Sequence, residues 1–221
     1  AGGYICVVAM ARLGVPFLAA LPLAFLAPEG HGAVLERLLY RRLSGAGPLD
    51  QVLFSIGLAF MSVAVAAYIF GTVQQPIRTP EFLRGGISAY GITLGYYRLF
   101  LVVVALAVTA ALVIGLEHTR FGAMVRAAVD NQRMARGLGI NVDITFAITF
   151  ALGSGLAGLG GALAIEVVGL DSYFALGFLV NVLIIVAVGG LGSITGSFAA
   201  AMLIGVSDIA GKYYAQDFGA F

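Results

Sequence analysis

Long runs of apolar residues alternate with short polar segments along most of the chain. A helix needs about 20 mainly apolar residues to cross a bilayer. Three runs of about that length are uninterrupted: Leu49–Gly71, Arg98–Leu116 and Val142–Ile165. The apolar stretch Tyr4–Leu13, which a Gly-Val-Pro sequence follows, predicts the end of another helix, and Phe17–Ala27 begins the next.

Two regions interrupt this pattern. The residues Pro28-Glu29-Gly30-His31-Gly32 divide the second of these helices, so we expect a break before the apolar run resumes at Ala33. Further on, Tyr173–Val188 and Phe198–Ala210 are short apolar runs on either side of the Gly/Ser/Thr-rich loop Gly189–Ser197. Short apolar segments broken by glycine predict discontinuous or re-entrant helices. The expected fold is all-α, a polytopic transmembrane helical bundle with short broken or re-entrant helices near its C-terminal end.

Composition supports a membrane protein. Hydrophobic residues make up 61% of the 221 residues and charged residues 10%, against about 45–50% and about 25% in soluble domains. A soluble chain of this length could not bury so much apolar surface, and disordered or disulfide-rich classes are excluded as well. A net charge of +1 gives no footprint for nucleic acid. The single cysteine, Cys6, forms no internal disulfide, and no cofactor or metal site is predicted.

The two ends of the sequence suggest a piece of a larger protein. The first residues already lie in an apolar stretch without an initiator Met or the features of a signal peptide. Apolar character resumes at the other end. We therefore expect residues 1–221 to be a single transmembrane domain that lacks helices at both ends.

Arginine residues predict the orientation. Arg37, Arg41 and Arg42 form one group, and a second group lies within 120–136, two spans further along the chain. Because an even number of spans separates the groups, both lie on the same side, and the positive-inside rule makes that side cytoplasmic. The polar segment Thr72–Tyr97 is then external.

The segment 117–141 is long for a connection within a compact bundle. Its Ala, Met and Arg residues favour helix, and Gly137 and Gly139 provide a stop. We predict a cytoplasmic helix over 119–139. A solvated connector is the plain alternative, but a helix held between two spans is better suited to docking a partner.

The expected docking surface has two parts. Arg126, Asp130 and Arg133 are spaced i, i+4 and i+7 on one helical face. Met124 and Ala128 belong to another face, which would pack. The candidate residues of this segment are Arg120, Gly122, Met124, Arg126, Ala127, Ala128, Asp130, Asn131, Arg133, Gly137 and Gly139.

Gly153-Ser-Gly155-Leu-Ala-Gly158 matches the GxGxxG pattern of dinucleotide-binding proteins. That site needs a preceding strand, whereas this motif lies inside a long apolar helix. Small residues repeated every four positions instead allow close contact between membrane helices. The predicted helix-packing residues are Ala151, Gly155, Gly158 and Ala162.

Three stretches resemble the permease subunits of branched-chain amino acid ABC importers, the LivH/LivM type. They are Glu36–Leu43, which is similar to the family's ERLxYRPL element; Thr119–Ala128 with Asn131 and Gly137–Val142; and Gly189–Gly196. The resemblance covers most of the chain, is strongest over Glu117–Lys212 and is closer to the LivH branch. Arg42 stands where the family usually has Pro. Urea-importer permeases are also similar.

This resemblance implies a multi-pass permease of the bacterial inner (plasma) membrane. Such permeases work in pairs of similar subunits. Two cytoplasmic ATP-binding subunits drive them, and a periplasmic substrate-binding protein delivers the substrate. Residues 117–141 would be the coupling segment that lies in a groove of the ATPase. The chain has no Walker motif, so it is expected to be a transport subunit and no enzyme, with ATP hydrolysis on the partners.

The expected substrates are branched-chain or related amino acids, which are zwitterions. A path for them needs few polar groups among apolar walls. The candidates, each of which could instead serve helix packing, are Thr149, Ser154, Asn181, Gly190, Gly192 and Ser193.

Three other functions remain open on the sequence alone. A urea or amide importer permease would look alike. An ion-coupled secondary carrier usually needs an ionisable residue inside a span, and Leu49–Gly71 and Arg98–Leu116 carry none in their interiors. A scaffold or assembly factor without transport activity is the last alternative.

Overall fold

The computed structural model describes residues 2–35, 37, 47–71, 74, 83, 85–89, 92–190 and 192–214. Its elements are α1 (Gly2–Leu13), α2 (Phe17–Leu35), α4 (Pro48–Phe70), β1 (Gly86–Ala89), β2 (Ile92–Gly95), α5 (Tyr96–Glu117), α6 (Arg120–Asp130), α7 (Gln132–Gly137), α8 (Val142–Val168), α9 (Phe174–Gly177), α10 (Leu179–Gly189) and α11 (Ile194–Tyr214). Within this described part, α2, α4, α5, α8 and α11 are long and apolar enough to cross a membrane. The expectation of a polytopic helical membrane bundle is confirmed.

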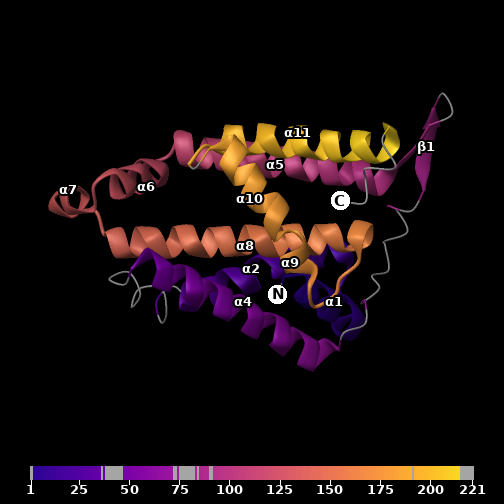
Figure 1. Ribbon diagram of the computed structural model, residues 1–221, viewed down its shortest axis with the longest axis horizontal. Helices are drawn as coiled ribbons and strands as arrows, with labels where there is room; N and C mark the ends of the chain where they lie inside the picture. The colour runs from indigo at the N-terminus through magenta and orange to yellow at the C-terminus, as the bar shows by residue number, and fades with distance from the viewer. Residues whose placement is uncertain are drawn as a thin grey trace.

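The helices form two layers (Figure 1). In one layer α8 packs on α1 and α2, and α4 meets α1 at its C-terminal end, where Phe70 stacks on Tyr4; in the other, α5 and α11 are in contact. Helix α10 crosses between the layers and packs on α11. The main buried core lies among α1, α2, α8 and the first turn of α5; its members include Cys6, Ala9, Phe17, Ala20, Leu21, Ala24, Tyr97 and Ala162.

The tightest helix contact is between α2 and α8. A Cβ atom at Gly158 would lie 2.5 Å from the Pro28 Cγ and would overlap the Ala24 carbonyl oxygen. A Cβ atom at Gly155 would lie 2.9 Å from the Phe25 ring. Small residues are therefore what allows the two backbones to meet. The buried positions on α8 include all four predicted packing residues: Ala151, Gly155, Gly158 and Ala162.

The expected break at 28–32 is wrong, because α2 continues through it to Leu35. Pro28 has no N–H to donate to the Ala24 carbonyl, but the oxygen of this same carbonyl is the atom nearest to the Cβ position of Gly158. A Cα–H group can partly satisfy a carbonyl at a helix crossing, and neighbouring helices make proline tolerable inside membrane helices. Gly32 is buried in the same interface, against the side chain of Ser154.

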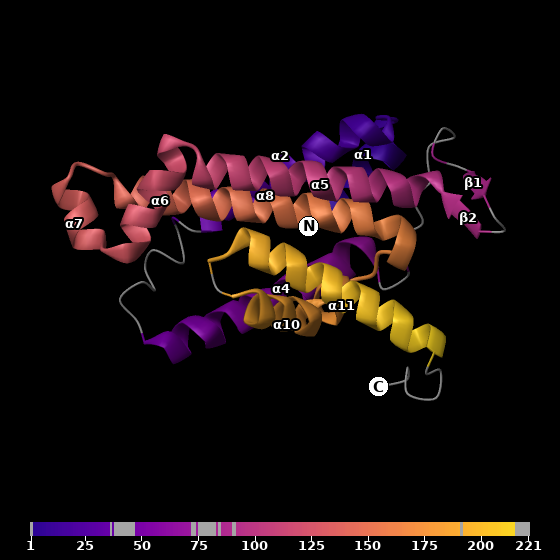
Figure 2. The same cartoon turned by 90° about the horizontal axis from the view of Figure 1, so that it is seen from above.

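The C-terminal region contains both short and long helices. The run 173–188 forms the short helices α9 and α10, as expected of a broken segment. The apolar run 198–210 predicts a helix shorter than the one in the structure, because α11 begins at Ile194 and has 21 residues. Ser193 starts it: its Oγ accepts a hydrogen bond from the Gly196 N–H at 3.0 Å, as capping residues do. Helices α10 and α11 pack on each other and lie side by side in Figure 2.

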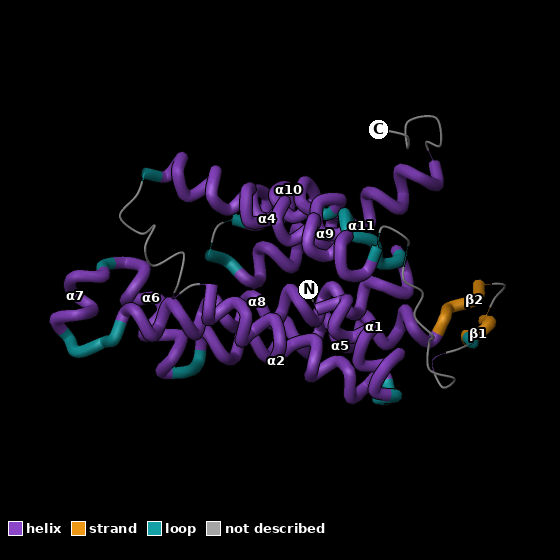
Figure 3. The backbone as a smooth tube through the Cα atoms, turned by 90° about the horizontal axis from the view of Figure 1, so that it is seen from below, coloured by secondary structure: helices purple, strands orange, loops and turns teal. Residues whose placement is uncertain are grey.

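A small β-hairpin lies at the end of the bundle opposite α6 and α7 (Figure 3). Strands β1 and β2 pair antiparallel, with Gly86 opposite Gly95. The sequence predicted a polar excursion over 72–97 and no strands; its charged residues Arg78, Glu81 and Arg84 lie outside the described residues. Directly after β2, the Tyr97 hydroxyl donates to the Leu163 carbonyl at 2.6 Å and joins α5 to α8.

We predict that Gly158→Leu destabilises the bundle while Gly160→Leu does not. Both changes add the same apolar side chain to α8, but a Cβ at Gly160 would meet nothing within 4 Å. Overpacking typically costs about 1–3 kcal/mol. Thermal unfolding of the purified protein in detergent measures the difference. Equal midpoints for the two variants would show that α2 and α8 are not in contact.

Candidate functional site

The junction of α5 with α6 is held by contacts to the last carbonyls of α5. The Thr119 side chain caps α6, accepting from the Gly122 N–H at 3.3 Å, and its hydroxyl donates to the Gly115 carbonyl. The Arg126 guanidinium donates to the Leu116 carbonyl. Carbonyls at a helix C-terminus have no partner within the helix, so these donors satisfy them and fix the angle at which α6 leaves α5.

Gly122 makes this junction possible. It is buried, and a Cβ atom at its position would overlap the Leu116 carbonyl oxygen. By contrast, Gly115, one turn before the junction, has open space around its Cβ position. Thus the first turn of α6 rests directly on the last turn of α5, and only glycine fits at the contact.

The prediction of one helix over 119–139 is wrong. Asn131 has an extended backbone (φ −153°, ψ 97°), and its side chain accepts from the Met134 N–H at 3.0 Å. Asparagine favours such local capping over a helix interior, so α6 ends and α7 begins here. Arg133 therefore does not continue the helical face of Arg126 and Asp130.

A small buried cluster holds α6 and α7 against α8. It consists of Ala128, Ala135 and Val142, all at most 2% exposed, with Ala127 packed against it. Because Ala128 is fully buried within the chain, it cannot contact a partner as expected. Its role in the segment is to position α6.

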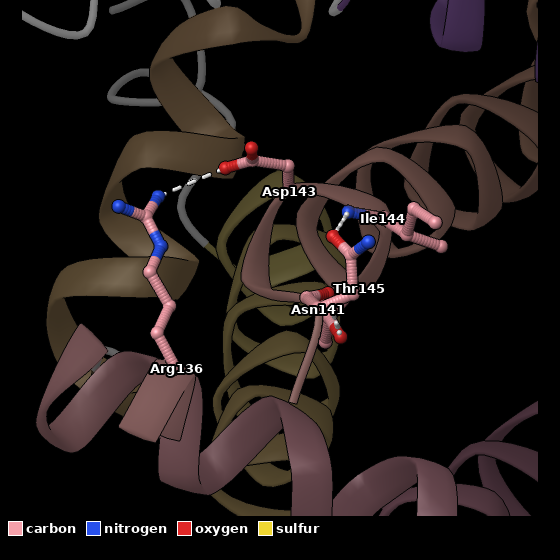
Figure 4. A network of polar contacts seen from close by, with 5 residues as sticks. All are labelled: Arg136, Asn141, Asp143, Ile144 and Thr145. Atoms are coloured by element: carbon pink, nitrogen blue, oxygen red, sulfur yellow. Dashed lines mark hydrogen bonds and ion pairs between the residues drawn. The ribbon is translucent and has the colours of Figure 1, made fainter. Parts of the chain in front are cut away.

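The return into the membrane has its own polar contacts (Figure 4). Gly139 turns the chain with a φ of 83°, a conformation that glycine adopts readily. Asn141 caps α8 by accepting from the Ile144 N–H at 3.1 Å. Arg136 pairs with Asp143 at 2.9 Å, linking α7 to the first turn of α8. Both ends of the segment are thus fastened to membrane helices.

The outer surface of the segment is apolar as well as charged. Met134 is 67% exposed and Leu138 78% exposed, and Met124 and Val129 are also exposed. The exposed polar or glycine candidates are Arg120, Arg126, Asp130, Asn131, Arg133, Gly137 and Gly139. These methionine and aliphatic side chains are exposed and lie outside the membrane spans. Such a surface is typical of one that a partner protein covers.

The structure does not gather the candidate path residues at one point. On α8, Thr149 donates to the Thr145 carbonyl, and Ser154 donates to its own helix and faces Gly32. Asn181 is exposed on α10. The remaining three lie in the turn before α11, where Gly190 and Gly192 have φ near 90° and Ser193 caps the helix: Gly190, Gly192 and Ser193.

Sequence reasoning overlooked the capping residues and the ion pair. Thr119 and Asn141 each precede a helix and accept from its third N–H, a signature readable from the sequence. Asp143 is spaced seven residues from Arg136, across a turn, so no helical spacing rule points to that pair.

Five membrane-length helices among the described residues define a multi-pass helical membrane protein. Residues 1–219 match the family described as "Branched-chain amino acid transport system / permease component", and the chain belongs to that family. It is therefore a permease-family protein of the inner membrane, and the resemblance seen in the sequence is confirmed.

Curated relatives carry related names. The chain is 28% identical over 223 residues to the high-affinity branched-chain amino acid transport system permease protein BraD of Pseudomonas aeruginosa, covering 95% of this chain and 72% of BraD. It is 26% identical to the permease protein LivH of Escherichia coli and 25% identical to that of Salmonella typhimurium, covering 86% of this chain and 63% of each relative. The chain thus spans less than two thirds of the LivH proteins. No solved structure matches it.

We predict that α6–α7 and the β-hairpin lie on opposite sides of the membrane. Cysteines introduced at Gln132 and at Gly86, in a Cys6→Ala background, should react with an impermeant thiol reagent from the cytoplasmic and the external side respectively. The basis is the arginine content of the α6–α7 end. Reaction of both positions from the same side would refute the span assignment.

Proposed function

We propose that residues 1–221 act as a single permease domain that carries branched-chain or related amino acids inward, driven by ATP hydrolysis on separate cytoplasmic subunits. A second permease subunit would complete the pathway, and a periplasmic binding protein would deliver the substrate. The substrate class follows the names of the relatives, and the family membership supports the transport role.

The α6–α7 segment carries the coupling part of the proposal. It is fastened to α5 at one end and to α8 at the other, yet Met134 and Leu138 remain exposed. A rigid element between two helices can turn movement of a bound partner into movement of both helices. The partner proposed is the ATP-binding subunit, with Met124, Met134 and Leu138 as apolar anchors.

Arg126 takes a second role in this proposal. Its guanidinium donates to the Leu116 carbonyl and so joins α6 to α5, while the side chain stays exposed and remains a candidate contact for the ATP-binding subunit. Asp130 and Arg133 are exposed and remain the other charged contacts proposed for the partner.

We predict that Gly122→Ala uncouples transport from ATP hydrolysis, whereas Gly115→Ala does not. The methyl group at 122 would collide with the Leu116 carbonyl, and that at 115 meets nothing within 4 Å. In proteoliposomes containing the assembled transporter, stimulation of ATP hydrolysis by loaded binding protein should fall severalfold for Gly122→Ala. Equal stimulation for both variants would show that the α5–α6 junction transmits nothing.

We also predict that the double change Met134→Ser and Leu138→Ser weakens retention of the ATP-binding subunit. Loss of a buried apolar anchor commonly costs more than about 1 kcal/mol at an interface, or several-fold in affinity. Gln132→Ser, on the same exposed helix, is the matched control. Co-purification under graded washing measures the effect. Undiminished retention of the double variant would place the docking surface elsewhere.

The same proteoliposomes distinguish the alternatives. Uptake of leucine that requires ATP supports the importer, and uptake of urea alone would indicate the related urea permease. Uptake driven by an ion gradient without ATP would indicate a secondary carrier. That alternative needs attention because the continuity of α2 places two ionisable residues, Glu29 and His31, inside a span.

A further inference from the structure

Helix α2 contains a polar segment, Glu29-Gly30-His31, within its membrane span. The packing of α2 on α8 fixes the depth of this segment in the bilayer. Pro28 contacts α8 at Gly158, and Gly32 contacts it at Ser154. The polar segment lies between these two contacts.

These contacts lie near the middle of the bilayer. The apolar part of α8 lies between Asp143 and Glu166, the charged residues that bracket it. Its residues 144–165 span about 33 Å at 1.5 Å per residue, close to the thickness of the hydrocarbon core. The midpoint of this run falls at residues 154–155, level with Gly32. Glu29 is therefore within about one helical turn of the midplane.

A carboxylate at this depth needs water or a partner. Asp, Glu, Lys and Arg near the bilayer centre cost about 2.5–3.5 kcal/mol on insertion scales and usually face a water-filled cavity or a counter-charge. Among the described residues, Glu29 has no hydrogen bond or ion pair. Its side chain is half-buried, so neighbouring groups shield part of it from lipid.

Beside Glu29, the face of α2 that points away from α8 is uncovered. Pro28 and Gly32 face α8, and Glu29 lies about 100° round the helix from Pro28. Beside it, a Cβ at Gly30 would meet nothing within 4 Å, so the backbone is uncovered there. His31 lies on the other flank and is exposed.

We propose that Glu29 lines a water-filled passage at the bilayer centre and receives the ammonium group of a zwitterionic amino acid. This proposal rests on the proposed import function. The carboxylate offers the charge opposite to the ammonium group at a depth far from both membrane surfaces, and the apolar residues of α2 around it suit an aliphatic side chain. The contact is an ion pair and involves no covalent step.

Access of water to Glu29 can be tested directly. Glu29→Cys and Leu21→Cys are made separately in a Cys6→Ala background of the assembled transporter, and each is treated with an impermeant, negatively charged methanethiosulfonate. Leu21 faces the helix core and is 9% exposed. Cys at 29 should be modified and protected by saturating leucine with its binding protein. Cys at 21 should stay unmodified, although it lies nearer the external surface.

A functional comparison completes the test. Glu29→Gln removes the charge at nearly constant shape and should raise the apparent KM for leucine uptake several-fold, whereas His31→Gln should leave it within about twofold. An unmodified Cys at 29, equal modification at 21 and 29, or wild-type KM in Glu29→Gln would each overturn the proposal. ATP-dependent leucine uptake by the unmodified transporter tests the proposed function, and its absence would refute that function. The Glu29 variants test only the role of Glu29 in a transporter that is active.

Discussion

The contact between the backbones of α2 and α8 is the constraint on which the rest of the fold depends. Gly155 and Gly158 have no side chain to hold α2 away, and Pro28 fits against the second of them. The first turn of α1 meets the same place, since a Cβ at Gly2 would overlap the backbone of Gly158. One short stretch of α8 thus contacts both α1 and α2. It also fixes the depth of the polar residues in α2.

Helix α5 is fastened differently at its two ends. At its N-terminal end, the Tyr97 hydroxyl donates to the Leu163 carbonyl of α8. At the other end, Arg126 bonds to the Leu116 carbonyl and ties α5 to α6. Between these points α5 is largely exposed and contacts α11. A displacement of α6 is therefore expected to tilt α5 about its N-terminal end, which would change the space between the two layers of helices.

The sequence was sufficient for the three uninterrupted spans α4, α5 and α8, because run length and hydropathy decide them with little help from tertiary contacts. It was not sufficient for α11, which begins at Ile194, before the apolar run. The packing face of α8 was also readable from its small residues. The sequence did not show that α2 is continuous. The packing of α8 offsets the loss of a backbone hydrogen bond at Pro28, and no local sequence rule reveals that packing. Nor did the sequence show the corner at Asn131, where a side-chain cap outweighs the helix propensity of the surrounding residues. Burial of Ala128 depends on where α8 begins, and this explains why a residue expected to dock faces inward instead.

The rigidity of the α5–α6 junction is tested most directly by spin-label distances in the assembled transporter, with and without ATP. Labels at Val129 on α6, Leu106 on α5 and Leu53 on α4 occupy exposed positions. A rigid junction predicts that the distance from 129 to 106 stays constant, while the distance from 106 to 53 shifts on ATP binding. A change from 129 to 106 with no change from 106 to 53 would mean that α6 slides on α5, and would contradict coupling through this junction.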